Sequence, residues 1–253
     1  MKLASRISLV IVATSIPLLC ALLYFILTGI NKDIEFATQE LRGNRYQAAL
    51  ENVLEPLLSY RIDLAEGASR VSLEAKEQQV DAALESLAAV DAELGKSLQF
   101  TPEGLAQRKR EGASAEAVTG KWKAIRGHAD ADAPAKLTAL VADVRTMIAH
   151  AGDTSNLILD PDLDSYYLMD ATLVVYPQMQ DRLASILLAS APIFEKTEAS
   201  FEERVQLAVQ ESMLREADLA RLAGDVQTSL NEDANFSGPS PTLGEKLPPR
   251  EYA

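Results

Sequence analysis

A dense run of polar and acidic side chains lies between residues 153 and 170, where the sequence reads DTSNLILDPDLDSYYLMD. Four acids fall within eleven positions of this run, and two adjacent tyrosines lie among them. Carboxylates can bind a cation or an amine, whereas an asparagine amide and tyrosine hydroxyls both donate and accept hydrogen bonds. This chemistry suits a small polar ligand and predicts a ligand site. Its candidate residues are Asn156, Asp160, Asp164, Tyr166, Tyr167 and Asp170.

Arg42 is the candidate for an anionic ligand group, because its guanidinium can hold a carboxylate or oxyanion with two parallel hydrogen bonds. It lies far from the acidic run in the sequence, which does not show whether the two meet. If Arg42 paired with one of the aspartates instead, both side chains would be structural and the predicted pocket would not exist.

A calcium loop is the first alternative for the acidic run. Asp160, Asp162 and Asp164 match the D-x-D-x-D opening of an EF-hand loop. That loop needs glycine at its sixth position and glutamate at its twelfth. Ser165 and Ala171 occupy those positions here, so a calcium site is not predicted.

Helix capping and core packing form the second alternative. Asp160-Pro161 is typical of a helix break, and Asp162 or Asp164 could cap the helix that follows. Tyr166 falls on an apolar seam of that helix. For any single residue of the run, this structural role competes with ligand binding.

Nothing in the sequence predicts catalysis, a metal site or a cofactor. His128 and His150 are the only histidines and lie 22 positions apart, which is a poor basis for a metal site. The nucleophile-elbow, P-loop and dinucleotide-binding motifs are missing from the sequence. We therefore do not expect an enzyme.

An apolar run of 24 residues, Ile7 to Ile30, precedes all of these candidates. It carries no charged side chain and is long enough to cross a bilayer. Lys2 and Arg6 precede it, which predicts a cytoplasmic N-terminus and an exported remainder, periplasmic if the membrane is the inner one. A cleaved signal peptide would have a shorter apolar stretch, and a lipoprotein would need small residues before Cys20. An uncleaved single-pass anchor in the inner (cytoplasmic) membrane is therefore predicted.

Composition limits what the exported part can do. The chain has 253 residues, 47% of them apolar, and a net charge of −13. Such an acidic chain repels nucleic acid, so binding of DNA or RNA is not expected. Cys20 is the only cysteine and lies in the apolar run, so no intramolecular disulfide can form.

Apolar residues spaced three and four apart predict an all-α fold, in which the N-terminal transmembrane helix continues into an elongated up-down helical bundle. No stretch of useful length alternates as a strand would. The first helix is expected to run from Asp33 to about Ala68, roughly 54 Å. Five seams carry this prediction: Tyr46, Leu50, Val53, Leu57, Tyr60 and Leu64; Val80, Leu84, Leu87, Leu94 and Leu98, with Asp91 at the one position missing; Leu137, Leu140, Val141, Val144 and Ile148; Tyr166, Met169, Leu173, Tyr176, Gln180, Leu183 and Leu187; and Leu219, Leu222, Val226 and Leu230.

The domain organisation follows from these patterns. We expect a cytoplasmic N-terminus at 1–6, a transmembrane helix at 7–30, a helical sensor bundle at 31–232 and a Pro/Gly-rich irregular segment at 233–253. Breaks are expected at Gly67 to Ser69, Gly127 to Pro134, Asp160-Pro161 and Ala191-Pro192, and Pro177 is expected to kink the fourth helical run. The irregular end looks like a loop that leads to a further element, which suggests a truncated chain.

The run from Ser155 to Asp170 resembles a stretch of the extracytoplasmic helical sensor domains of bacterial transmembrane receptors. These include methyl-accepting chemotaxis proteins, related sensor kinases and cyclic-dinucleotide enzymes. The segment from Glu35 to Gly43 also resembles the opening of the first sensor helix in such receptors, although Leu41 stands where glutamine is usual. The resemblance covers about residues 1 to 230 and does not single out one output domain.

The resemblance implies a ligand-sensing receptor part, most simply of the methyl-accepting chemotaxis type. In that family a second span, a HAMP linker and a signalling domain would follow, and a homodimer would form. The alternatives are an input domain of a sensor histidine kinase or of a cyclic-dinucleotide enzyme, or a single-span structural or adaptor protein without signalling output.

Overall fold

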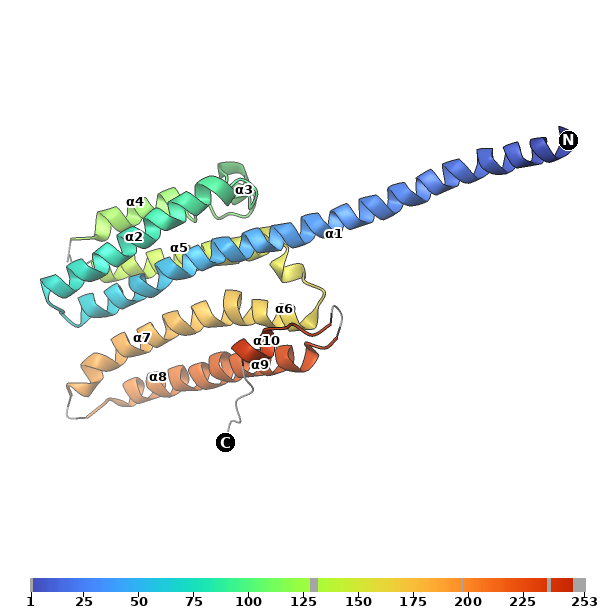
Figure 1. Ribbon diagram of the computed structural model, residues 1–253. Helices are drawn as coiled ribbons and strands as arrows, with labels where there is room; N and C mark the ends of the chain where they lie inside the picture. Colours follow the sequence, from blue (N-terminus) through green and yellow to red (C-terminus); the bar gives the residue numbers. More distant parts are fainter. Residues whose placement is uncertain (1, 128–131, 197, 236–237, 248–253) are drawn as a thin grey trace.

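The computed structural model describes residues 2–127, 132–196, 198–235 and 238–247, with side chains from Ser15 onward. These residues form helices and connecting turns without a strand, so the predicted all-α fold is confirmed. The molecule is elongated, and its N-terminal helix projects well beyond the bundle (Figure 1).

Helix α1, Lys2–Ala65, is the long helix on which several other helices pack. Its 64 residues include Pro17 and Pro56 and correspond to roughly 95 Å at the usual helical rise. Its N-terminal part is long and apolar enough to span a membrane, and none of that apolar window is buried in the protein. The C-terminal half enters the bundle without a break, so one helix joins the apolar segment to the core.

Helices α1, α2, α4 and α5 form a four-helix unit. The turn after α1 contains Gly67 in a left-handed conformation (φ 69°), and the Ser69 hydroxyl caps helix α2, Arg70–Leu94. The predicted break at this point is therefore confirmed. Two short helices follow, α3 (Pro102–Gln107) and α4 (Ala115–Ile125), and then α5, Ala133–Thr154. The expected turn from Gly127 to Pro134 lies partly outside the described residues, as does His128.

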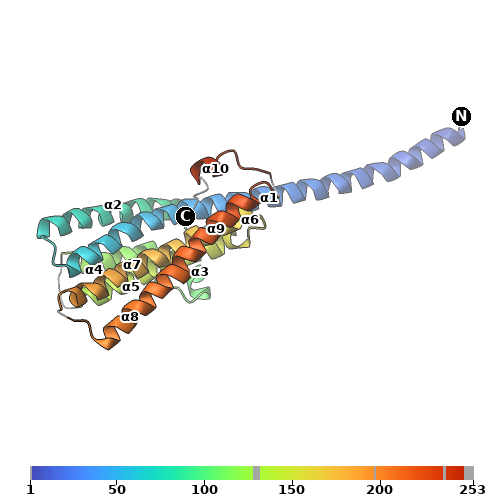
Figure 2. The ribbon, with the colours of Figure 1, turned by 90° about the horizontal axis from the view of Figure 1, so that it is seen from below.

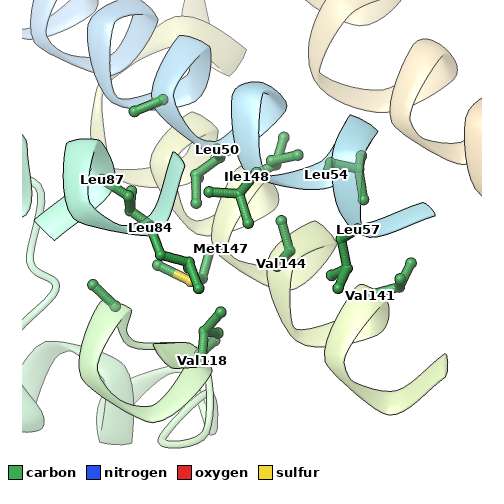
Figure 3. Close-up of a cluster of buried hydrophobic side chains, with 14 of the residues drawn as sticks. Leu50, Leu54, Leu57, Leu84, Leu87, Val118, Val141, Val144, Met147 and Ile148 are labelled. Carbon is green, nitrogen blue, oxygen red and sulfur yellow. The ribbon is translucent and has the colours of Figure 1, made fainter. Parts of the chain in front are cut away.

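The core of the four-helix unit is built from the first three predicted seams. Their side chains pack against one another and against Val118 of α4 (Figure 3). Asp91, the polar residue within the second seam, accepts a hydrogen bond of 2.6 Å from the hydroxyl of buried Tyr46. Trp122 stacks edge-on against Tyr60 at the far end of the unit. The seam residues in this core include Leu50, Leu57, Val80, Leu84, Leu87, Leu98, Leu137, Leu140, Val141, Val144 and Ile148.

Two longer helical rods complete the fold and form what we call the C-terminal hairpin. The first rod contains α6 (Leu163–Met169), the π-helix η2 (Asp170–Val175) and α7 (Tyr176–Phe194). The second contains α8 (Phe201–Ser212), the π-helix η3 (Met213–Leu219) and α9 (Ala220–Glu232). The first rod packs on α1 and the second lies outside it, antiparallel (Figure 2). A 3-10 turn η1, Leu157–Leu159, connects α5 to this hairpin, and a single-turn helix α10, Leu243–Lys246, lies in the C-terminal segment.

The fourth predicted seam is wrong at its first residue, Tyr166, and again beyond Leu173. Tyr176 and Leu187 on that seam are 43% and 51% exposed, whereas Pro177 and Met179 are buried. The π-helix η2 causes this shift, because its wider turn rotates all following residues about the helix axis. The expected break at Ala191-Pro192 is also wrong, since α7 continues to Phe194 with Pro192 in its last turn.

Candidate functional site

The turn that follows α5 packs directly onto α1 just outside the apolar segment. Gly43 makes this approach close, because a Cβ atom there would lie 2.2 Å from the Cβ of Ser155 and 3.0 Å from a Leu157 methyl carbon. Ser155 is fully buried, and Leu157 belongs to the core. The beginning of the predicted site is therefore fixed against the helix that carries the apolar segment.

Gln39 connects the same part of α1 to the ends of two other helices. Its side-chain amide donates hydrogen bonds of 2.8 Å to the carbonyl oxygen of Ser97 and 3.1 Å to that of Thr154. Ser97 follows the end of α2, and Thr154 is the last residue of α5. Carbonyl oxygens at helix ends lack partners within the helix. Gln39 satisfies one such group at Thr154 and a carbonyl of the turn after α2 at Ser97, and so links α1 to the ends of α2 and α5.

A cleft of about 450 Å³ opens beside this junction, and we call it the membrane-proximal cleft because it lies next to the apolar segment of α1. Arg42 and Asn156 both line it, so the structure brings together two of the candidate residues that are 114 positions apart. The Arg42 guanidinium donates a 3.1 Å hydrogen bond to the Gln39 side chain. Asn156 adopts a left-handed backbone conformation (φ 69°), which asparagine tolerates better than most residues. The full lining is Lys32, Glu35, Phe36, Gln39, Arg42, Ser97 and Asn156.

The chemistry of the membrane-proximal cleft suits a small polar ligand with an anionic group. Lys32 and Arg42 supply two cations, and Glu35 supplies one carboxylate. The hydrogen bond to Gln39 uses one of the five N–H groups of Arg42, and a bidentate contact needs two. The amide of Asn156 can donate to or accept from a second ligand group.

Asp160 does not line the cleft, but it lies near Glu40 of α1. Burial raises the pKa of Glu40 on α1, and the nearby carboxylates of Asp160 and Asp162 raise it further. Asp160 also accepts a 3.0 Å hydrogen bond from the backbone N–H of Asp162, which shapes the turn before α6. Asp162 occupies the N-cap position of α6, but its side chain makes no capping hydrogen bond. Asp160 therefore has a visible structural role at this turn.

Asp164, Tyr166 and Tyr167 lie on the first two turns of α6. Asp164 accepts a 2.8 Å hydrogen bond from the N–H of Ser165, and it lies in the first helical turn, where an acid is favoured. The two tyrosine rings make an edge-to-face contact with centroids 5.5 Å apart. Tyr166 is 37% exposed, so it is not part of the core as its seam position predicted.

Asp170 forms an ion pair that joins the two rods of the C-terminal hairpin. Its carboxylate accepts bonds of 2.7 and 2.8 Å from Arg221 on α9. Asp225, one turn along α9, also contacts Asp170. Burial is the main cause that raises the pKa of Asp225 to about 6, and the contact with Asp170 raises it further. No sequence pattern indicates this ion pair, because Arg221 lies 51 residues away on a helix whose seam predicts only apolar packing.

His150 has a structural role in the core. His150 is buried, contacts the carbonyl oxygens of Leu98 and Gln99 at 3.2 Å, and lies against the ring of Phe100. Burial lowers its pKa and so favours the neutral imidazole. Within the part of the chain that the structure describes, no group of three or more His, Cys, Asp or Glu side chains is placed to hold a metal ion.

The chain was compared with known protein families, curated proteins and solved structures. No protein-family model, curated protein or solved structure matches the chain.

Proposed function

We propose that this chain is the ligand-sensing, extracytoplasmic part of a transmembrane signalling receptor, of the methyl-accepting chemotaxis type. One observation carries the proposal: α1 runs as a single helix from the apolar segment through the full length of the bundle core. A rigid helix of this kind can transmit a small shift or rotation from the bundle to a membrane, because packed helices move as units.

The junction at Gly43 and Gln39 supports this role. Gly43 lies 13 residues beyond Ile30, which corresponds to roughly 20 Å along the helix. The ends of α2 and α5 and the turn to the hairpin all contact α1 there. A ligand in the membrane-proximal cleft would touch the moving helix and its fixed neighbours at once. Arg42 and Asn156 are the residues proposed to hold it.

The proposed orientation places the bundle on the periplasmic side of the inner membrane. Lys2 and Arg6 precede the apolar segment, and the acidic bundle follows it. The test is labelling with a membrane-impermeant maleimide in a Cys20→Ser background. A cysteine at exposed Ala124 on α4 should react in intact cells, and one at Ser5 should react only after permeabilisation. The reverse pattern would contradict this orientation.

We also propose that the receptor is a homodimer. Two-fold dimers are the commonest assembly, and α8 together with the first residue of η3 exposes an apolar row that a second copy could cover. Its members are Val205, Val209 and Met213, each more than 40% exposed. Cross-linking in membranes at native expression should give a dimer, and a monomer under those conditions would contradict the proposal.

Sensing itself is tested by a thermal-shift screen of small polar compounds on the full chain in lipid nanodiscs. A ligand of the membrane-proximal cleft should lose binding with Arg42→Ala and Asn156→Ala. Tyr167→Phe tests the α6 end of the segment. If the three variants fold normally and bind a discovered ligand unchanged, the ligand site lies elsewhere in the bundle.

A further inference from the structure

A groove separate from the membrane-proximal cleft runs between α5 and α7, where the C-terminal hairpin meets the four-helix unit. It consists of two adjoining hollows of about 290 and 200 Å³, which share Arg145 and Gln178. Together they fall within the usual size range of small-molecule sites. We call this feature the α5–α7 groove. One end is polar and the other apolar, so it has the amphipathic lining of a ligand site.

The polar end has more positive than negative side chains. Asp181 is held by two guanidinium groups, those of Arg61 on α1 at 3.1 Å and Arg145 on α5 at 2.8 Å. Arg182 pairs with Asp218 of the π-helix η3 at 2.6 Å. Three arginines therefore face two aspartates, which leaves one excess positive charge in a chain whose net charge is −13. Such a local excess favours an anion.

The apolar end is shaped by the absence of a side chain at Gly152. A Cβ atom there would lie 3.2 Å from a methyl carbon of Leu173 and 3.4 Å from one of Ile158, so even alanine would crowd this wall. Ile158 remains 40% exposed. Asp153 lines this end too, but Arg110 neutralises it at 2.6 Å. The apolar end of the groove therefore favours the uncharged, apolar part of a ligand.

We propose that the α5–α7 groove binds a small monocarboxylate that carries an apolar body, with the carboxylate on Arg145. The Asp181 bond uses one of the five N–H groups of Arg145, so others can donate to a ligand. Asp181 keeps its partner Arg61 when Arg145 turns toward the ligand. The cost of leaving the partly buried Asp181 carboxylate unpaired is thereby avoided.

This ligand class deepens the proposed sensor function and rests on it for its biological meaning. A carboxylate bound to Arg145 competes with Asp181, and Asp181 in turn contacts α1 through Arg61. The ligand body would bridge α5 and α7. Binding therefore shifts the contacts of the C-terminal hairpin with the helix that leads to the membrane.

The test is isothermal titration calorimetry of the full chain in lipid nanodiscs, with empty nanodiscs as the blank. The probe is 3-phenylpropionate, and three compounds separate its features: propionate lacks the apolar body, 3-phenylpropan-1-ol lacks the charge, and 3-phenylpropylamine reverses it. We expect saturable binding of 3-phenylpropionate and at least tenfold weaker binding of the other three. Equal binding of the alcohol or the amine would overturn the proposal, as would no binding of 3-phenylpropionate.

Three variants locate the binding. Ala149 is exposed in the groove, so Ala149→Leu should fill it and abolish binding without disturbing the core. Ala139→Leu is the matched control, an exposed position on the same helix that does not line the groove. Arg145→Gln should weaken binding roughly tenfold to a hundredfold, the usual effect of losing a charge-assisted hydrogen bond. Unchanged affinity in Ala149→Leu, with circular dichroism showing a native fold, would overturn the assignment.

The binding test of the groove and the tests of the receptor function can fail independently of each other. Failure of 3-phenylpropionate to bind removes the α5–α7 groove as its site and leaves the receptor assignment to the maleimide-labelling and cross-linking tests. Binding by a chain with reversed topology would keep the groove and remove the receptor assignment.

Discussion

Replacing Gly43 by alanine should test the junction between α1 and the turn after α5. The new Cβ would lie 2.2 Å from the Cβ and 2.3 Å from the Oγ of Ser155. Favourable carbon–carbon contacts lie near 3.5–4.0 Å, so one of the two segments must move. Ser155 is fully buried, directly after the end of α5, and cannot rotate out of the way at its Cβ.

The expected cost follows from two opposing effects. Overpacking in a well-packed core costs roughly 1–3 kcal/mol. Alanine in a helix is favoured over glycine by about 1 kcal/mol, which offsets part of that cost. The balance is a net loss of up to about 2 kcal/mol, and in a chain of this length each kcal/mol lowers the melting temperature by roughly 2–4 °C.

The assay is thermal unfolding of the full chain in detergent, followed by circular dichroism at 222 nm. Gly120→Ala in α4 is the matched control, because it is exposed and a Cβ there meets nothing within 4 Å. Gly120→Ala should raise the melting temperature slightly, and Gly43→Ala should lower it. Adding Ser155→Gly to Gly43→Ala should recover most of the loss. If Gly43→Ala stabilises the chain as the control does, the close packing at this junction is wrong.

Two further predictions concern charged groups between the helices. Both carboxylate oxygens of Glu51 are buried without a hydrogen-bond partner among the described residues, and burial raises its pKa from 4.5 to about 7. The folded chain binds this proton more tightly than the unfolded chain, so Glu51 lowers stability increasingly as pH rises from about 4.5 through 7. Glu51→Gln should therefore raise the melting temperature at pH 8 and change it little at pH 5, and an effect that is the same at both pH values would contradict this reasoning. Arg221→Gln should lower the free energy of unfolding by roughly 1–3 kcal/mol in urea titrations, because Asp170 loses two charge-assisted hydrogen bonds and faces Asp225 alone. The exposed Arg204→Gln, as control, should stay within about 0.5 kcal/mol, and equal effects of the two variants would argue against the ion pair.

The sequence predicted the fold best where regular α-helices pack on one another. The first three seams became the core of the four-helix unit, because spacings of three and four residues keep Leu50, Leu84 and Leu140 on one face of each helix. The fourth seam failed after Leu173, where a π-helical turn rotates the following residues. No periodicity in the sequence marks that turn.

The candidate site was harder to predict, because its contacts join distant parts of the chain. The sequence singled out Arg42 and Asn156, but their shared cleft depends on Gly43 packing against Ser155. Asp170 was proposed as a ligand-binding residue from its type alone, and its partner Arg221 became visible only in the folded hairpin. Side-chain chemistry indicates candidates, whereas the helix packing decides which of them meet.

The coding sequence beyond codon 253 tests the receptor assignment most directly. The account predicts that it encodes a second apolar span of about 20 residues, followed by a linker with heptad spacing and a cytoplasmic signalling domain. A stop codon directly after Ala253 would contradict it and favour a single-span structural or adaptor protein.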